Sequence, residues 1–149
     1  MLPKNIISFH KQNQKFHLCR KKNLSKWIAE VVLKEKRALG DIAFIFCSDR
    51  QLNKINHKYL NTNNLTDIIT FDYCDGKIIS GDIFISVERV RENASLYQFL
   101  FLDELHRVMI HGVLHLLGYS DKTKKGKIEM TQKEDLYLSL RPLKIKCFT

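Results

Sequence analysis

One long run of helix-forming residues, positions 102–117, places the strongest constraint on how this chain can fold. The run is apolar on nearly all sides, so a helix formed by it has to pass through the core. Within the run, His111 and His115 stand four residues apart, and they therefore share one helix face about one turn apart. Their ring nitrogens can converge on a single ion.

The residues after this run supply a candidate third ligand. Gly118 stands where a helix needs a residue that tolerates positive φ in order to stop and turn back. Asp121 follows three residues later, so the turn could aim its carboxylate at the same ion. The two histidines alone also fit a hydrogen-bonded pair of core imidazoles. Three protein ligands and an open position are what a catalytic metal site requires, and the whole pattern predicts metal binding.

The ligand types indicate which metal and which reaction to expect. Neutral imidazoles with one carboxylate suit zinc best, although nickel, cobalt and ferrous iron accept the same ligands. Such a site lowers the pKa of bound water towards neutrality, which predicts hydrolysis. The spacing also occurs in metzincin proteases, where a glutamate directly after the first histidine is the general base. Gly112 holds that position here, so a protease would lack its proton acceptor.

Composition and charge narrow the class of protein. The 149 residues suit one ordinary domain, and a hydrophobic content of 44% predicts a globular fold. The 25 Lys and Arg residues exceed the 16 Asp and Glu residues, and the formal charge of +9 favours a polyanionic partner such as RNA, DNA or an acidic membrane surface. Each basic cluster alone is typical of a solvated surface. Taken together, the clusters fit contact with nucleic acid as well as they fit a solvated surface. The clusters are residues 20–22, 34–37, 122–127 and 144–146.

The cysteines and the ends of the chain bear on its location. The four cysteines are far apart and form no Cys-x-x-Cys pair, which argues against a thiolate zinc site and fits a reduced cytoplasmic protein. The start of the chain lacks the pattern of a signal peptide, and no run of about 18 apolar residues occurs. We therefore expect neither secretion nor a membrane span.

Four strands are expected from the short apolar and alternating runs at residues 6–9, 42–47, 68–73 and 78–87. Asp75-Gly76 is a hairpin signal that makes the last two strands antiparallel. Gly81, inside the second arm, indicates a bulge or a close backbone approach. Together with five helices, these strands predict an α+β fold, a single layered domain in which a mixed sheet of about four strands packs against about five helices.

The helices are expected where apolar residues recur at helical spacing. Trp27 belongs to the apolar face of the first helix, and Ser48 and Asp49 are N-cap candidates for the second. Asp103 is expected to start the helix that carries the histidines. The helices should cover about residues 24–34, 51–60, 86–101, 103–117 and 128–140.

Four blocks of the sequence resemble the YbeY family, the metal-dependent endoribonucleases also called rRNA maturation factors. The first block is His111-Gly112-x-Leu114-His115-Leu116-x-Gly118-Tyr119. The second is Thr66-Asp67-Ile68-Ile69-Thr70-Phe71, within residues 59–71, and the third is Gly81-Asp82-Ile83. The fourth is the closing helix, with Glu129-Met130 and Glu134. The blocks agree in order and spacing over residues 42–138.

This resemblance implies a cytoplasmic α+β protein with one zinc ion. It implies activity on single-stranded RNA, in the maturation of small-subunit rRNA and in ribosome quality control, with no DNA or membrane partner. Carried over by position, the metal ligands are His111, His115 and Asp121. The substrate-cleft candidates are Thr66 and Asp67, which a helix-to-strand turn explains equally well, and Lys58. His57 is a candidate proton donor, and His106 is expected to be a surface or core histidine.

Two positions depart from the family pattern. The family commonly has a histidine where this chain has Asp121, and the charge of a carboxylate ligand makes a bound water less acidic. Leu60 stands where many members carry an arginine suited to gripping phosphate, so Lys58 or His57 would have to substitute for it. The missing arginine keeps a second hypothesis open, a ribosome-assembly factor that binds RNA without cutting it and holds a structural metal.

Overall fold

The computed structural model describes residues 6–12, 15–60 and 66–142 of the chain. The strands are β1 (Ile7–Lys11), β2 (Ala38–Cys47), β3 (Ile68–Asp72) and β4 (Ile78–Ser86). The helices are α1 (Lys21–Lys34), α2 (Asp49–Ile55), α3 (Val87–Leu96), α4 (Phe101–Leu116) and α5 (Lys124–Ser139), and a π-helical turn, η1 (Asn56–Leu60), follows α2 directly.

The strands form one mixed sheet in the order β1-β2-β4-β3. β3 and β4 pair antiparallel around the predicted Asp75-Gly76 turn, whereas β1 pairs with β2 and β2 with β4 in parallel. The close approach predicted at Gly81 is confirmed, because a Cβ there would lie 2.5 Å from the carbonyl oxygen of Phe71. The register shift of the sheet falls on the neighbouring strand, between Leu39 and Ile42.

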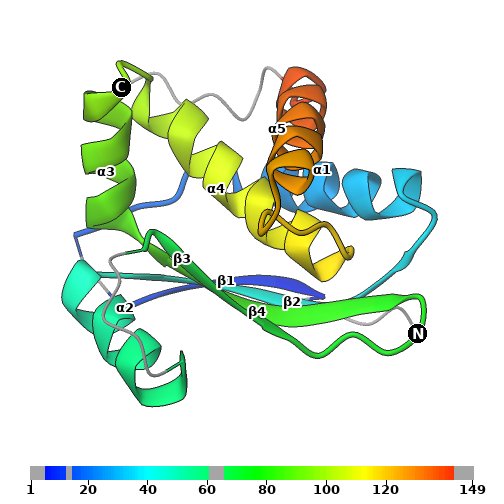
Figure 1. Cartoon of the computed structure of the whole chain (residues 1–149), viewed down its shortest axis with the longest axis horizontal. Helices are drawn as coiled ribbons and strands as arrows, with labels where there is room; N and C mark the ends of the chain where they lie inside the picture. Colours follow the sequence, from blue (N-terminus) through cyan, green and yellow to red (C-terminus); the bar gives the residue numbers. More distant parts are fainter. Residues whose placement is uncertain (1–5, 13–14, 61–65, 143–149) are drawn as a thin grey trace.

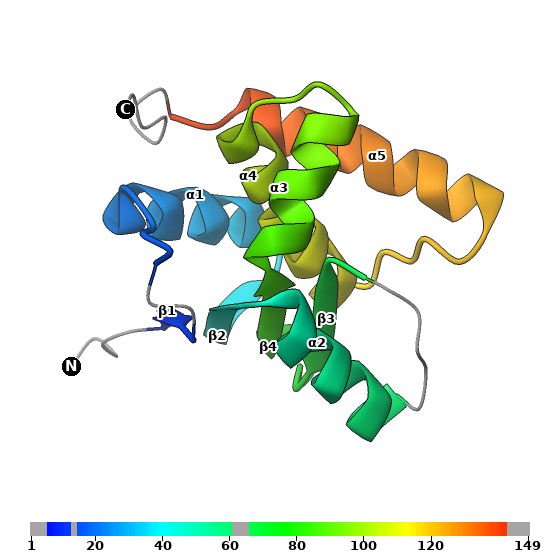
Figure 2. The same ribbon diagram turned by 90° about the vertical axis from the view of Figure 1, so that its left-hand side faces the viewer.

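Four helices, α1, α3, α4 and α5, lie on one face of the sheet, and α2 lies on the other (Figures 1 and 2). The main core forms between the sheet and the four-helix side, where Phe44, Ile83 and Met109 are fully buried. α4 passes through this core, as its all-round apolar sequence predicted. Trp27 is 1% exposed, which confirms that it is a core residue. The predicted α+β fold with a mixed four-stranded sheet is therefore confirmed.

Several helix boundaries differ from the predictions. α3 ends at Leu96 instead of continuing to residue 101, because Gln98 adopts a left-handed φ of 60° and reverses the chain before α4. No glycine or proline marks that corner in the sequence. α4 begins at Phe101, ahead of Asp103, and α5 begins at Lys124, after the N-cap Thr123, so that part of the predicted basic loop is helical.

The second predicted helix is divided into two parts. Ser48 caps α2 as expected, in a capping box with Gln51, and Asp49 is the first residue inside the helix. From Asn56 onward the helical turn widens into η1, a form that is rare in proteins and usually confined to single turns. Lys58 and His57 therefore lie on a π-helical turn and not on a regular α-helix.

Two further features concern the predicted location and redox state. Within the described residues, no helix is both long enough and apolar enough to cross a bilayer. Cys19, Cys47 and Cys74 are free thiols. Cys147 and the basic cluster at 144–146 lie outside the described residues.

Candidate metal centre

The last two turns of α4 carry His111 and His115, whose Nε2 atoms lie 2.9 Å apart. The helix approaches the sheet very closely at Gly112, where a Cβ would lie 2.8 Å from Cγ2 of Ile83 and 3.0 Å from Cδ1 of Ile68. A glycine is needed here so that the backbone of α4 can rest on β3 and β4. Gly112 thus has a packing role, and it also stands where a metzincin protease would have its general-base glutamate.

The turn after α4 brings the third predicted ligand to the histidines. Gly118 has a φ of 103°, and the Tyr119 amide donates to the carbonyl of Leu114, which closes the helix with the hydrogen bond of a Schellman motif. The returning chain places Oδ2 of Asp121 3.4 Å from Nε2 of His111 and 3.8 Å from Nε2 of His115. The predicted helix stop and the predicted approach of Asp121 are both present.

These three separations fit a zinc-sized opening. Ligands placed about 2.0–2.1 Å from a tetrahedral zinc ion are roughly 3.3 Å from one another. The observed separations of 2.9, 3.4 and 3.8 Å bracket that value. Among the described residues, this trio is the group of three or more His, Cys, Asp and Glu side chains that could hold a metal ion. Three protein ligands leave the fourth tetrahedral position open.

The second ring nitrogen of each histidine is held by an acceptor. Nδ1 of His111 lies 2.5 Å from Oε2 of Glu134, and Nδ1 of His115 lies 3.1 Å from the carbonyl oxygen of Tyr119. A carbonyl or an ionised carboxylate can only accept, so both Nδ1 atoms carry the proton and both Nε2 lone pairs face the opening. This is the arrangement that orients histidine ligands in metal proteins.

The local environment shifts the pKa values of the two histidines in opposite directions. Burial lowers the pKa of His111, but the hydrogen bond and charge of Glu134, followed by Asp121 and Asp67, outweigh burial, and the net pKa is raised. Burial and the neighbouring His111 lower the pKa of His115. A lowered pKa favours the neutral imidazole that metal binding requires.

Glu134 is the site residue that the sequence analysis missed as a functional group. It is only 7% exposed, and its other oxygen accepts from Nη1 of Arg107 at 2.9 Å. A signal was available, because Met130, Glu134 and Tyr137 share the buried face of α5 at helical spacing. A glutamate within an apolar face has to be paired, which marks it as a candidate partner for a histidine or an arginine.

A hydrogen-bond cluster around the carboxylate of Glu35 holds the loop that carries Asp121. The hydroxyl of Tyr119 donates to Oε1 of Glu35 at 2.6 Å, while Tyr137 and Lys133 donate to Oε2 of the same carboxylate. Burial raises the pKa of Glu35, but these three donors outweigh it, and the net pKa is lowered. This cluster joins the end of α1, the loop that carries Asp121 and α5. Tyr119 is therefore held by hydrogen bonds at both its hydroxyl and its carbonyl.

The predicted cleft residues fall in different places. Asp67 lines a cavity of about 270 Å³ together with His111 and Asp121. Thr66 does not line this cavity, and its hydroxyl donates to the carbonyl of Ile68 at 3.0 Å, which shapes the turn into β3. Neither Lys58 nor His57 is among the described residues that line it. Lys58 lies over the ring of Tyr59, 5.2 Å from its centroid.

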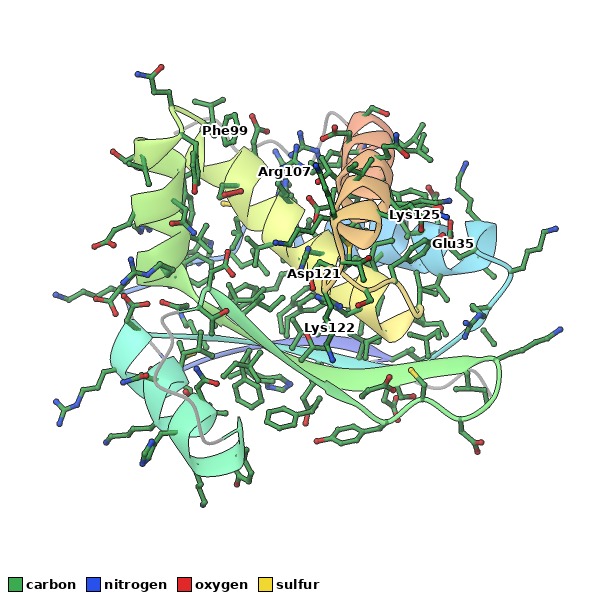
Figure 3. The ribbon with its side chains drawn as sticks, viewed as in Figure 1. Glu35, Phe99, Arg107, Asp121, Lys122 and Lys125 are labelled. Carbon is green, nitrogen blue, oxygen red and sulfur yellow. The ribbon has the colours of Figure 1, made fainter. Side chains whose placement is uncertain are left out.

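Two of the basic clusters, residues 34–37 and 122–127, lie near the loop that carries Asp121. Lys122 follows Asp121 directly, and Glu35 and Lys125, labelled in Figure 3, line one cavity together with Tyr119 of the loop. That cavity has a volume of about 560 Å³ and is also lined by Arg37. Arg37 belongs to the cluster at 34–37, and its guanidinium donates to the carbonyl of Leu117 at 3.1 Å. Both clusters therefore place positive charge beside the loop that carries Asp121.

Together, the fold and the site define an α+β protein with a His-His-Asp candidate metal centre that is open on one side. A model of the Endoribonuclease YbeY family matches residues 5–140. Proteins named Endoribonuclease YbeY are 50% identical in Karelsulcia muelleri, over 89% of this chain and 94% of the relative, and 48% identical in Amoebophilus asiaticus, over 92% and 94%. The chain belongs to the YbeY family, which confirms the resemblance in the sequence blocks.

The structural comparison agrees with this assignment. The solution structure of a protein from Thermotoga maritima is 29% identical and has a TM-score of 0.65, covering 89% of this chain and 87% of that chain.

Proposed function

We propose that this protein is a zinc-dependent endoribonuclease that cleaves single-stranded RNA, with His111, His115 and Asp121 as the metal ligands. One observation carries the proposal: the three ligand atoms lie within 4.8 Å of one another, with the fourth position open, in a member of the Endoribonuclease YbeY family. The names of the curated relatives support RNA as the substrate. We place the activity in the cytoplasm, in small-subunit rRNA maturation and ribosome quality control.

The side chains around the site have distinct tasks in this proposal. A bound zinc ion would supply Lewis acidity and a water that ionises near neutral pH. Glu134 holds the His111 ring, and the Tyr119 carbonyl holds the His115 ring, so neither has to reorient when substrate arrives. Lys122, Lys125 and Arg37 provide positive charge that attracts the phosphate backbone to the opening.

Metal analysis and cleavage by matched variants test the proposal. The metal content of the purified protein is measured, and a labelled single-stranded RNA is incubated with it, with and without a chelator. His111→Ala and Asp121→Ala should lose metal, and His115→Ala should lose cleavage. His10→Ala, an exposed histidine remote from the site and purified identically, should keep both and controls for contaminating ribonucleases. Full metal occupancy in the His111 and Asp121 variants would overturn the ligand assignment.

The residue at position 60 favours a second candidate. Many family members carry an arginine there, whereas this chain has Leu60, whose side chain lies outside the described part of the structure. A factor that binds RNA during ribosome assembly, with a structural metal, has no need of that arginine. Retained RNA binding without chelator-sensitive cleavage, by protein with a full complement of metal, would favour this candidate over the enzyme.

A further inference from the structure

Glu104, in the first turn of α4, is a buried carboxylate with no donor of its own. The residue is 7% exposed and faces the cavity that Asp67 and His111 line. Within the described residues its side chain makes no hydrogen bond and no ion pair. Burial, followed by the charge of Asp67, raises the pKa of Glu104, and burial also raises the pKa of Asp67. An ionised carboxylate left in this state is costly unless it takes up a proton or something outside the chain supplies a donor.

Besides Asp67, Glu104 and the two metal ligands His111 and Asp121, this cavity is lined by Glu134 and by one cationic and two apolar side chains. Arg107 lines it and already donates to Glu134 and Asp135, at 2.9 and 2.7 Å. A guanidinium carries five N–H groups, so those two bonds leave it with donors to offer. Ile68 and Val108 supply the apolar walls. Both oxygens of Glu134 already accept, from Arg107 and His111, so away from the metal ligands the cavity offers Asp67 and Glu104 as further acceptors and Arg107 as a donor, between aliphatic side chains.

A second metal ion is a poor match for this cavity. Among the described residues, three metal-ligating side chains gather only at His111, His115 and Asp121, so Asp67 and Glu104 have no third protein ligand. A neutral group with an edge of two donors and one acceptor matches better. Its size is limited, since about 270 Å³ lies below the roughly 300 Å³ at which pockets for drug-sized ligands begin.

We propose that this cavity is a guanine subsite, in which Asp67 and Glu104 accept from the N1–H and N2–H groups of the base and Arg107 donates to O6. Guanine is the RNA base whose pairing edge has two adjacent donors beside an acceptor, and unstacked bases of single-stranded RNA are read on this edge. The inference rests on the proposed function, and it adds base selection to it. His111 and Asp121 line the same cavity, so a base bound there places its own phosphodiester beside the metal centre.

Binding of mononucleotides tests the subsite without relying on cleavage. Isotope-labelled protein is titrated with 5′-GMP, 5′-IMP and 5′-AMP while the amide resonances of Ile68 and Val108 are followed by NMR. The three probes share the same phosphate and differ only in the base. GMP should bind about ten-fold or more tightly than AMP, because AMP lacks both donors, and IMP, which lacks the 2-amino group, should fall between them.

Glu104→Gln keeps the shape of the side chain but replaces one acceptor oxygen with a donor, and it should remove the preference for GMP. Asp67→Asn provides a second variant if the first fails to fold, which circular dichroism would reveal. Glu30→Gln removes the same charge from an exposed position on α1 and should retain the preference. Equal affinity for GMP and AMP in the wild type, or a preference that survives in both cavity variants, overturns the proposal.

Two further outcomes separate this inference from the proposed function. If the wild type binds GMP selectively but cleaves no RNA, the subsite stands and the nuclease proposal fails. If it cleaves single-stranded RNA with no excess of guanosine beside the cut, and Ile68 and Val108 respond to none of the nucleotides, the nuclease stands and the subsite fails. Shifts produced by Mg²⁺ alone at these residues, with no effect of GMP, would indicate a second cation site instead and would also overturn the subsite.

Discussion

Replacing Glu134 by glutamine should weaken metal binding although Glu134 is not itself a ligand. The carboxylate accepts from Nδ1 of His111 at 2.5 Å and from Arg107 at 2.9 Å. An amide has one oxygen, so it can satisfy one of these donors but turns its own NH₂ group toward the other. The His111 ring then loses either its orientation or its proton on Nδ1, and Nε2 no longer presents a fixed lone pair.

The size of the effect follows from the kind of hydrogen bond that is lost. Hydrogen bonds to charged groups contribute about 1.5–3 kcal/mol. That range corresponds to roughly 10- to 100-fold in affinity, at about 1.4 kcal/mol per factor of ten. Loss of an outer partner of a metal-bound histidine typically costs the same 10–100-fold. We therefore expect the Kd for zinc to rise by about one to two orders of magnitude.

The assay is a competition titration of zinc against a chromogenic chelator at fixed pH and ionic strength. Asp135→Asn is the matched control, because Asp135 also accepts from Arg107, at 2.7 Å, but does not contact His111. That variant should bind zinc with unchanged affinity. Unfolding by urea without metal, measured on both variants, separates general destabilisation from an effect on the ligand.

An unchanged zinc affinity in Glu134→Gln would refute the reasoning, because it would mean that the His111 ring is held without the carboxylate. An equal loss of affinity in Asp135→Asn would also refute it. That result would assign the effect to Arg107 and not to the bond on His111.

Three further predictions concern packing, pH and metal removal. Gly112→Ala should lower the free energy of unfolding by about 1–3 kcal/mol in urea titrations, because its Cβ would lie 2.8 Å from Ile83, and an unchanged value would contradict the close contact. Burial and the charge of Arg141, only partly offset by Asp103, lower the pKa of His106 to about 4. Between these pH values the unfolded chain binds a proton at His106 that the folded chain does not bind. The free energy of unfolding should therefore fall by about 3 kcal/mol as the pH drops from 6.5 to 4, and His106→Asn should reduce this pH dependence. Zinc removal should lower the Tm, and added zinc should raise it again with the logarithm of the free zinc concentration. A Tm that does not depend on zinc would contradict a site that exists only in the folded state.

Much of the metal centre could be predicted because its spacing is local. Residues four apart on a helix share a face whatever the helix packs against, so the sequence placed His111 beside His115. A glycine at a helix end reverses the chain in many folds, which brought Asp121 back towards them. The Asp75-Gly76 turn likewise predicted an antiparallel pair from adjacent residues alone.

Other features depend on residues that meet only after packing. The sequence did not indicate that β2 pairs in parallel with β4 while β3 takes the edge, because strand order depends on how the helices cover the sheet. The α3–α4 corner was missed because the left-handed residue there is Gln98 and not glycine. His106 could be read as surface or core, and only the tertiary structure showed it 1% exposed.

The difference between what the sequence determined and what the tertiary structure decided is clearest at the candidate metal centre. The sequence by itself determined the family and the three candidate ligands, which lie within eleven consecutive residues, from His111 to Asp121. The tertiary structure decided what surrounds them: Glu134 comes from α5, Asp67 from the approach to β3 and Glu35 from the end of α1. Side-chain periodicity shows that a residue faces inward, but it does not show which residue it will meet, because that depends on the packing of separate elements.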